Sequence, residues 1–153
     1  MNNLLKYALS IFKTIYFNFK VLDYKKALKM PILISYSTKI YDIHKNSICI
    51  NSEKIETAMI KIGFGGTDFI ASQKSSIKVE KGAKIEFKGK AFLSEGIAIS
   101  VEKDAVLTFG ENFSCNKNCI IVCIFNIFNI ILVNSRYIWY ILGIYYLYTS
   151  LSC

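Results

Sequence analysis

Three groups of residues in this chain are of types that carry chemistry: one histidine, a glycine cluster and three evenly spaced cysteines. The only histidine is His44, in the segment Tyr41-Asp-Ile-His-Lys. An imidazole is the commonest general base in enzymes, and a serine nucleophile would depend on it here. A single histidine so far from the other candidate groups forms no Ser-His-acid set. We expect His44 to lie at the surface or at an edge, not to act as a base.

The glycine cluster is Gly63-Phe-Gly-Gly66, which has the start of a dinucleotide-binding loop. Asp68 stands where the third glycine of G-x-G-x-x-G belongs, and no helix signal follows the preceding β segment. We therefore interpret these glycines as a turn between strands.

The three cysteines are Cys115, Cys119 and Cys123, spaced four residues apart. Thiolates bind zinc or iron–sulfur clusters, but those sites use different spacings and need a fourth ligand, which is not adjacent here. Small buried core residues are the alternative interpretation, and the one we favour. The sequence thus assigns no catalytic residue and no metal ligand, and the cofactor-binding residues are unknown.

Composition describes one basic domain. The chain has 153 residues, a net charge of +8 and a pI of about 9.2. Such a charge suits nucleic acid, an anionic membrane or a phosphate-bearing cofactor. The lysines are spread along the chain without an aromatic–basic ladder, so we expect no nucleic-acid partner. Five cysteines, an odd number, and no secretory signal indicate a cytoplasmic protein, with the inner membrane surface as an alternative location.

The elements that would position these groups begin with a helix. Apolar residues recur at three- and four-residue steps over residues 3–20, which predicts an amphipathic helix. The apolar face contains Leu5, Ala8, Leu9, Phe12, Ile15, Tyr16 and Phe19, and Lys6, Ser10, Lys13 and Lys20 line the opposite side. This face either docks on the inner membrane surface or packs against the rest of the protein or a neighbouring subunit. Asp23 is a candidate cap for a second helix over residues 24–29, which Pro31 ends.

Short β segments follow, at residues 32–35, 39–43, 47–51 and 58–62. From Val79 a six-residue rhythm begins, which is typical of a hexapeptide β-helix. The inward positions it predicts are Val79, Ile85, Ala91, Ile97, Phe109, Cys115 and Ile121, with a slip near residues 101–108. An antiparallel meander or sandwich would also explain apolar alternation, but not the rhythm.

Residues 60–69 (IKIGFGGTDF), 85–91 (IEFKGKA) and 109–116 (FGENFSCN) together resemble the hexapeptide-repeat acyltransferases. Within them, the chain is most similar to bacterial O-acetyltransferases of polysaccharide or capsule biosynthesis, over residues 12–123, the N-terminal portion of such a protein. The resemblance implies a left-handed parallel β-helix, a homotrimer and acetyl-CoA bound between adjacent subunits. It also implies a sugar or polysaccharide hydroxyl as acceptor and a histidine base in an Asp-Gly-His segment. This sequence has no such segment, so we expect it to be inactive in acetyl transfer as it stands.

The last part of the chain has a different composition. Residues 118–153 contain one charged residue, Arg136, and 24 of these 36 residues are Ile, Asn, Phe, Tyr or Leu. A frameshift in an A/T-rich gene would give such a tail, and a membrane segment is the alternative. Two apolar runs flank Asn134 to Arg136, and each is shorter than a membrane span.

These observations divide the chain into three parts: an N-terminal helical segment (residues 1–30), an incomplete β-helix (31–123) and an apolar tail (124–153). Two functions from different classes follow. One is an acetyl-CoA-dependent O-acetyltransferase, implied by the resemblance, although the missing histidine segment leaves enzyme activity undecided. The other is a non-enzymatic, membrane-associated structural or interaction protein, with a peripheral membrane contact through its basic amphipathic N-terminus.

Overall fold

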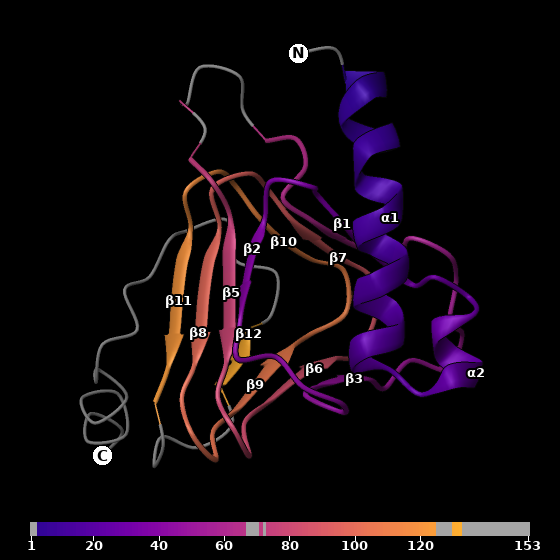
Figure 1. Ribbon diagram of the computed structural model, residues 1–153. Helices are drawn as coiled ribbons and strands as arrows, with labels where there is room; N and C mark the ends of the chain where they lie inside the picture. The colour runs from indigo at the N-terminus through magenta and orange to yellow at the C-terminus, as the bar shows by residue number, and fades with distance from the viewer. Residues whose placement is uncertain (1–2, 67–70, 72, 125–129, 133–153) are drawn as a thin grey trace.

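The computed structural model describes residues 3–66, 71, 73–124 and 130–132 (Figure 1). This part of the protein is mostly β, with three four-stranded parallel sheets and helices at its N-terminal end. The strand orders are β1-β4-β7-β10, β11-β8-β5-β2 and β12-β9-β6-β3. Successive strands of the chain belong to the first, second and third sheet in turn. Each sheet therefore contains every third strand. This order is consistent with a parallel β-helix, and it rules out the antiparallel alternative.

We call each set of three consecutive strands a round. The first two rounds are β1 (Ile32–Ile34), β2 (Lys39–Tyr41), β3 (Ile48–Ile50), β4 (Ile60–Ile62), β5 (Ser76–Val79) and β6 (Lys84–Phe87). The last two are β7 (Ala91–Leu93), β8 (Ala98–Val101), β9 (Val106–Phe109), β10 (Phe113–Cys115), β11 (Ile120–Cys123) and β12 (Ile130–Leu132). The first four strands agree with the β segments predicted from the sequence.

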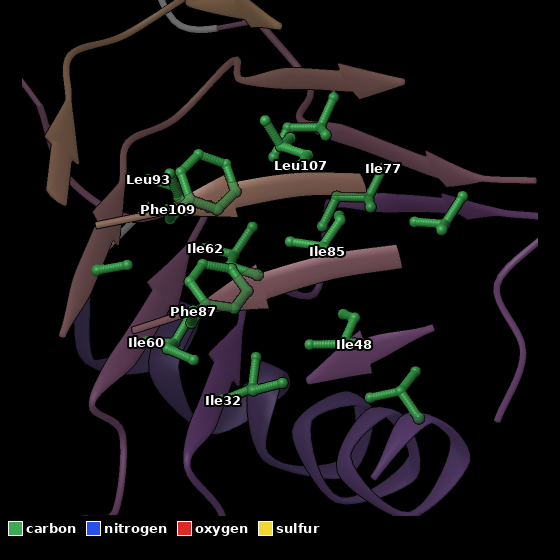
Figure 2. Close-up of a cluster of buried hydrophobic side chains, with 14 of the residues drawn as sticks. Ile32, Ile48, Ile60, Ile62, Ile77, Ile85, Phe87, Leu93, Leu107 and Phe109 are labelled. Carbon is green, nitrogen blue, oxygen red and sulfur yellow. The ribbon is translucent and has the colours of Figure 1, made fainter. Parts of the chain in front are cut away.

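The core lies between the three sheets, because alternate residues of each strand point inward (Figure 2). Side chains of the same column stack from round to round: Phe87 lies 5.0 Å from Phe109 between ring centroids. Burying one large apolar side chain stabilises a fold by about 1.5–3 kcal/mol. Of the predicted inward positions, Val79, Ile85, Ala91, Ile97 and Phe109 are buried, whereas Cys115 and Ile121 are half-buried.

The predicted six-residue register differs from the observed one. Ile77 pairs with Ile99, and Phe87 pairs with Phe109, so partners in these two strand pairs are 22 positions apart. This is four residues more than three hexads. The extra length lies in the corners, which hold three or four residues between β5 and β11.

One of these corners shows how the longer turns form. The amide of Ala83 donates to the carbonyl of Glu80 at 3.0 Å, and Ala105 donates to Glu102 in the same way one round later. Gly82 in the first turn has a φ of +85°, and Asp104 holds the equivalent place with a φ of +60°. Aspartate tolerates this left-handed conformation better than most side chains. Because one turn has glycine and the equivalent turn has aspartate, the repeat is not evident from the turn residues alone.

Helix α1 (Asn3–Val21) agrees with the predicted helix and packs against β1 at the first-round end of the stack (Figure 1). The side that packs is the opposite of the expected one. Ser10, Thr14 and Asn18 are buried, whereas Phe12 and Tyr16 of the predicted apolar face are 82% and 59% exposed. The expectation that this apolar face packs against the rest of the chain is therefore wrong for the described residues.

The physical reason is the free edge of β1, whose backbone groups need hydrogen-bond partners. Thr14 Oγ1 accepts from the amide of Ile34 at 3.2 Å, and Ser10 Oγ accepts from the amide of Tyr36 at 3.0 Å. Asn18 bonds both backbone groups of Ile32. Polar residues four apart on one helix face thus take the place of a neighbouring strand.

The remaining segments bear on two predictions. Helix α2 (Tyr24–Ala27) follows Asp23, whose side chain makes no capping hydrogen bond; its carbonyl accepts from the amide of Ala27 at 2.8 Å instead. Most of the apolar tail lies outside the described residues, apart from Ile124 and β12, which pairs with β9. None of the helices described is long and apolar enough to cross a membrane.

Candidate functional site

The candidate site is a groove at the corner where β2, β5 and β8 lead into β3, β6 and β9. It has a volume of about 600 Å³ and is lined by Asp42, His44, Glu80, Lys81 and Lys103. These residues come from three successive rounds, because the equivalent corners stack on one another. The groove therefore brings together the chain's only histidine and four charged residues.

His44 is held in the groove by its own turn. Its ring Nδ1 lies 3.1 Å from the carbonyl oxygen of Asp42, and the hydroxyl of Ser47 donates to the carbonyl of His44 at 2.7 Å. When Nδ1 carries the proton and donates a hydrogen bond to the backbone carbonyl of Asp42, the lone pair of Nε2 is the one available as a base. The sequence-based expectation of a surface or edge position agrees with the half-buried ring.

Glu80 is the carboxylate of this corner that both a lysine side chain and a backbone amide bind. Lys78 Nζ donates to its Oε1 at 2.5 Å, and the amide of Lys103 donates to Oε2 at 3.1 Å. These two hydrogen bonds, with that of Lys78 the larger cause, lower the pKa of Glu80 below its ordinary value. Glu80 is therefore ionised at neutral pH and unsuited to donate a proton. The ammonium groups of Lys81 and Lys103 face the carboxylates of Asp42 and Glu80 in this lining, so the formal charges of the groove balance.

The sequence analysis missed these four charged residues, although a signal for two of them exists. Val79-Glu-Lys81 and Val101-Glu-Lys103 are the same tripeptide 22 positions apart, as the pairing of Val79 with Val101 requires. A search at that period would have placed Lys81 and Lys103 at one corner. Nothing in the sequence indicated that His44 would lie beside them.

The glycine cluster forms a different corner, between β4 and β5. Gly63, Gly65 and Gly66 all have positive φ, as predicted for a turn. The amide of Gly63 donates to the carbonyl of Leu93, so it is not available to a phosphate. A Cβ on Gly66 would lie 2.5 Å from Lys117 Cγ, which shows that close packing requires this glycine.

The same corner contains an ion pair that the sequence did not reveal. Lys117 Nζ lies 4.0 Å from Glu95 Oε2, and their side chains are 8% and 18% exposed. The two residues hold equivalent places in successive rounds. Because burial makes a single charge costly, removing either partner would leave the other charge uncompensated. Asn118 beside it binds the preceding loop through the carbonyl of Ala71 at 2.9 Å.

The cysteines pack as part of the core. Cys123 is buried, and Cys115 and Cys119 pack against the core from half-buried positions. Cys115 and Cys119 share a hydrogen bond, which lowers the pKa of Cys119 to about 7 and raises that of Cys115. Among the described residues there is no group of three or more His, Cys, Asp or Glu side chains that could hold a metal ion.

Comparison with known proteins adds no relative. Neither a family model, nor a curated protein, nor a solved structure matches this chain.

Proposed function

We propose that this protein is a left-handed parallel β-helix of the hexapeptide acyltransferase type, built for acetyl-CoA-dependent O-acetyl transfer to a sugar hydroxyl. The observation that carries the proposal is the rotation of the chain through three parallel sheets, each taking every third strand. The resemblance of residues 60–69, 85–91 and 109–116 to that family supports it. By the same resemblance, the chain forms a homotrimer and binds acetyl-CoA between adjacent subunits.

The reaction defines what the site must contain. A general base takes the proton of the acceptor hydroxyl, the oxygen attacks the thioester carbonyl, and the CoA thiolate leaves. In the family this base lies in an Asp-Gly-His segment, which the sequence lacks. His44 belongs to the first round, well before the rounds that carry the family's base. We therefore assign His44 no catalytic role and expect no acetyl transfer from this chain.

The lysine side chains of the groove bear on coenzyme binding and not on the acetyl-transfer step. Coenzyme A carries several phosphate groups, which lysine ammonium groups attract, and equivalent lysines in successive rounds lie at one corner beside carboxylates. Lys81 and Lys103 form such a pair in the groove beside His44. They are the residues that we expect to contribute if the coenzyme contacts this corner.

The test is an acetyl-transfer assay on the purified chain, with acetyl-CoA and a panel of sugar acceptors. We expect no acetyl ester above the rate without protein. The variant His44→Ala, measured in parallel, identifies the source of any turnover. Activity that is lost in His44→Ala would contradict the assignment of no catalytic role to His44 and place the catalytic centre in the groove. Activity that survives in this variant would contradict the expectation of an inactive chain, because a base elsewhere in the chain would then exist.

A further inference from the structure

Helix α1 turns its most apolar side away from the protein. Leu5, Leu9, Phe12, Ile15 and Tyr16, which we call the outer face of α1, lie three or four residues apart and are 41% to 82% exposed. In Figure 1 α1 stands at the first-round end of the stack, beside β1. A contiguous apolar surface of this kind on a folded protein marks an interaction site.

The helix is oriented this way by its hydrogen bonds, not by chance exposure. Ser10, Thr14 and Asn18 must face β1 to satisfy its edge, and these residues lie on the side opposite the outer face. Lys13 Nζ adds bonds to the carbonyls of Tyr36 and Thr38. The outer face therefore cannot turn inward without breaking this set of bonds.

The apolar surface continues from α1 onto α2. Tyr24 is 66% exposed and Leu28 is 56% exposed, and the ring of Tyr24 lies 5.8 Å from that of Phe19 of α1. Three of the exposed side chains are thus aromatic: Phe12, Tyr16 and Tyr24. Aromatic residues with a polar tip, such as tyrosine, are enriched where a membrane meets water.

The charges around this surface are mostly positive. Lys20 Nζ lies 5.5 Å from the ring centroid of Tyr16, and Lys25 and Lys29 are exposed on and just after α2. Asp23 is the only acidic residue before Asp42. A second copy of the same face would bring these lysines against each other, which is unfavourable. An anionic surface is complementary to both the lysines and the apolar residues.

We propose that the outer face of α1, together with α2, binds the surface of a membrane that contains anionic phospholipid. The helix lies in the plane of the interface, with Phe12 at the centre of the inserted side and the lysines among the headgroups. This inference does not depend on whether the chain transfers acetyl groups. It also leaves the β sheets outside the membrane, because α1 lies between them and the lipid.

The experiment is cosedimentation of the full chain with two kinds of vesicle: phosphatidylcholine alone, and phosphatidylcholine with phosphatidylglycerol. We expect binding to the second kind that weakens as salt is added. The double variant Phe12→Ser, Tyr16→Ser should bind roughly a hundredfold more weakly, since it loses two inserted side chains. Lys25→Glu with Lys29→Glu should weaken binding to the anionic vesicles as well.

The matched control is Tyr41→Ser, which removes an exposed aromatic side chain from β2 and should leave vesicle binding unchanged. Far-UV circular dichroism confirms that each variant is folded. Equal binding to neutral vesicles would overturn the proposal. So would unchanged binding by the double variant, the result expected if the apolar C-terminal residues bind the lipid. A double variant that binds vesicles normally but dissociates an oligomer in sedimentation velocity would show that a second copy occupies this face.

Discussion

Asn18 is the residue whose loss tests how α1 is attached. Its side chain is fully buried, with Nδ2 2.7 Å from the carbonyl oxygen of Ile32 and Oδ1 3.1 Å from the amide nitrogen of Ile32. Asn18→Ala leaves both backbone groups of Ile32 buried without a partner. Each unsatisfied buried group costs about 1–3 kcal/mol. The free energy of unfolding should therefore fall by about 2–6 kcal/mol.

The assay is urea unfolding at equilibrium, followed by circular dichroism and analysed for the midpoint and the slope. Asn51→Ala is the matched control, because Asn51 is exposed and uses only its backbone amide, which donates to the carbonyl of Phe87 at 2.8 Å. This control should change the free energy by less than about 0.5 kcal/mol. A loss below about 1 kcal/mol for Asn18→Ala would refute the reasoning, since water would then have to reach the edge of β1.

Three further predictions concern the core and two titrating groups. Phe109→Ala removes a fully buried ring that lies 4.8 Å from Phe113, and should cost about 3–5 kcal/mol in the same urea assay; a cost near zero would contradict the packing. Glu56 accepts from Lys54 and Lys90, with the Lys54 hydrogen bond the larger cause, which lowers its pKa to about 2. Because the pKa of Glu56 is lower in the folded than in the unfolded state, its ion pairs stabilise the fold slightly at pH values above the unfolded-state pKa of about 4.3. This small stabilisation is lost as the pH falls toward 2. Carboxyl NMR titration checks this, and an ordinary pKa would contradict it. Cys119 should be alkylated with a midpoint near pH 7, which Cys115→Ala should raise; mass spectrometry of the alkylated peptides measures both, and an unchanged midpoint in the variant would contradict the shared hydrogen bond.

The β segments of the fold could be predicted because strand alternation is a local property. Ile60 and Ile62 are buried and Lys61 between them is not, as the sequence alone indicates. The number of residues in a round was harder to predict from the sequence. The predicted hexads did not keep the register of the strands, because the corners are set by turn hydrogen bonds such as Ala105 to Glu102, which alternation does not report.

The orientation of α1 could not be predicted from periodicity, because periodicity assumes that the apolar face turns inward. Here the deciding groups are the unpaired amides and carbonyls of β1, which only the tertiary structure exposes to Ser10, Thr14 and Asn18. The groove at His44 was hidden for a related reason. Its residues are far apart in the sequence and meet only because corners of successive rounds stack.

Binding of acetyl-CoA to the purified protein is the most direct test of the proposed acyltransferase scaffold. Isothermal titration calorimetry, with sedimentation equilibrium on the same sample, gives the stoichiometry and the number of chains in the particle. The proposal predicts a trimer that binds one acetyl-CoA for each chain without hydrolysing or transferring the acetyl group. A protein that shows no heat of binding at any coenzyme concentration, or that remains a monomer, would contradict it.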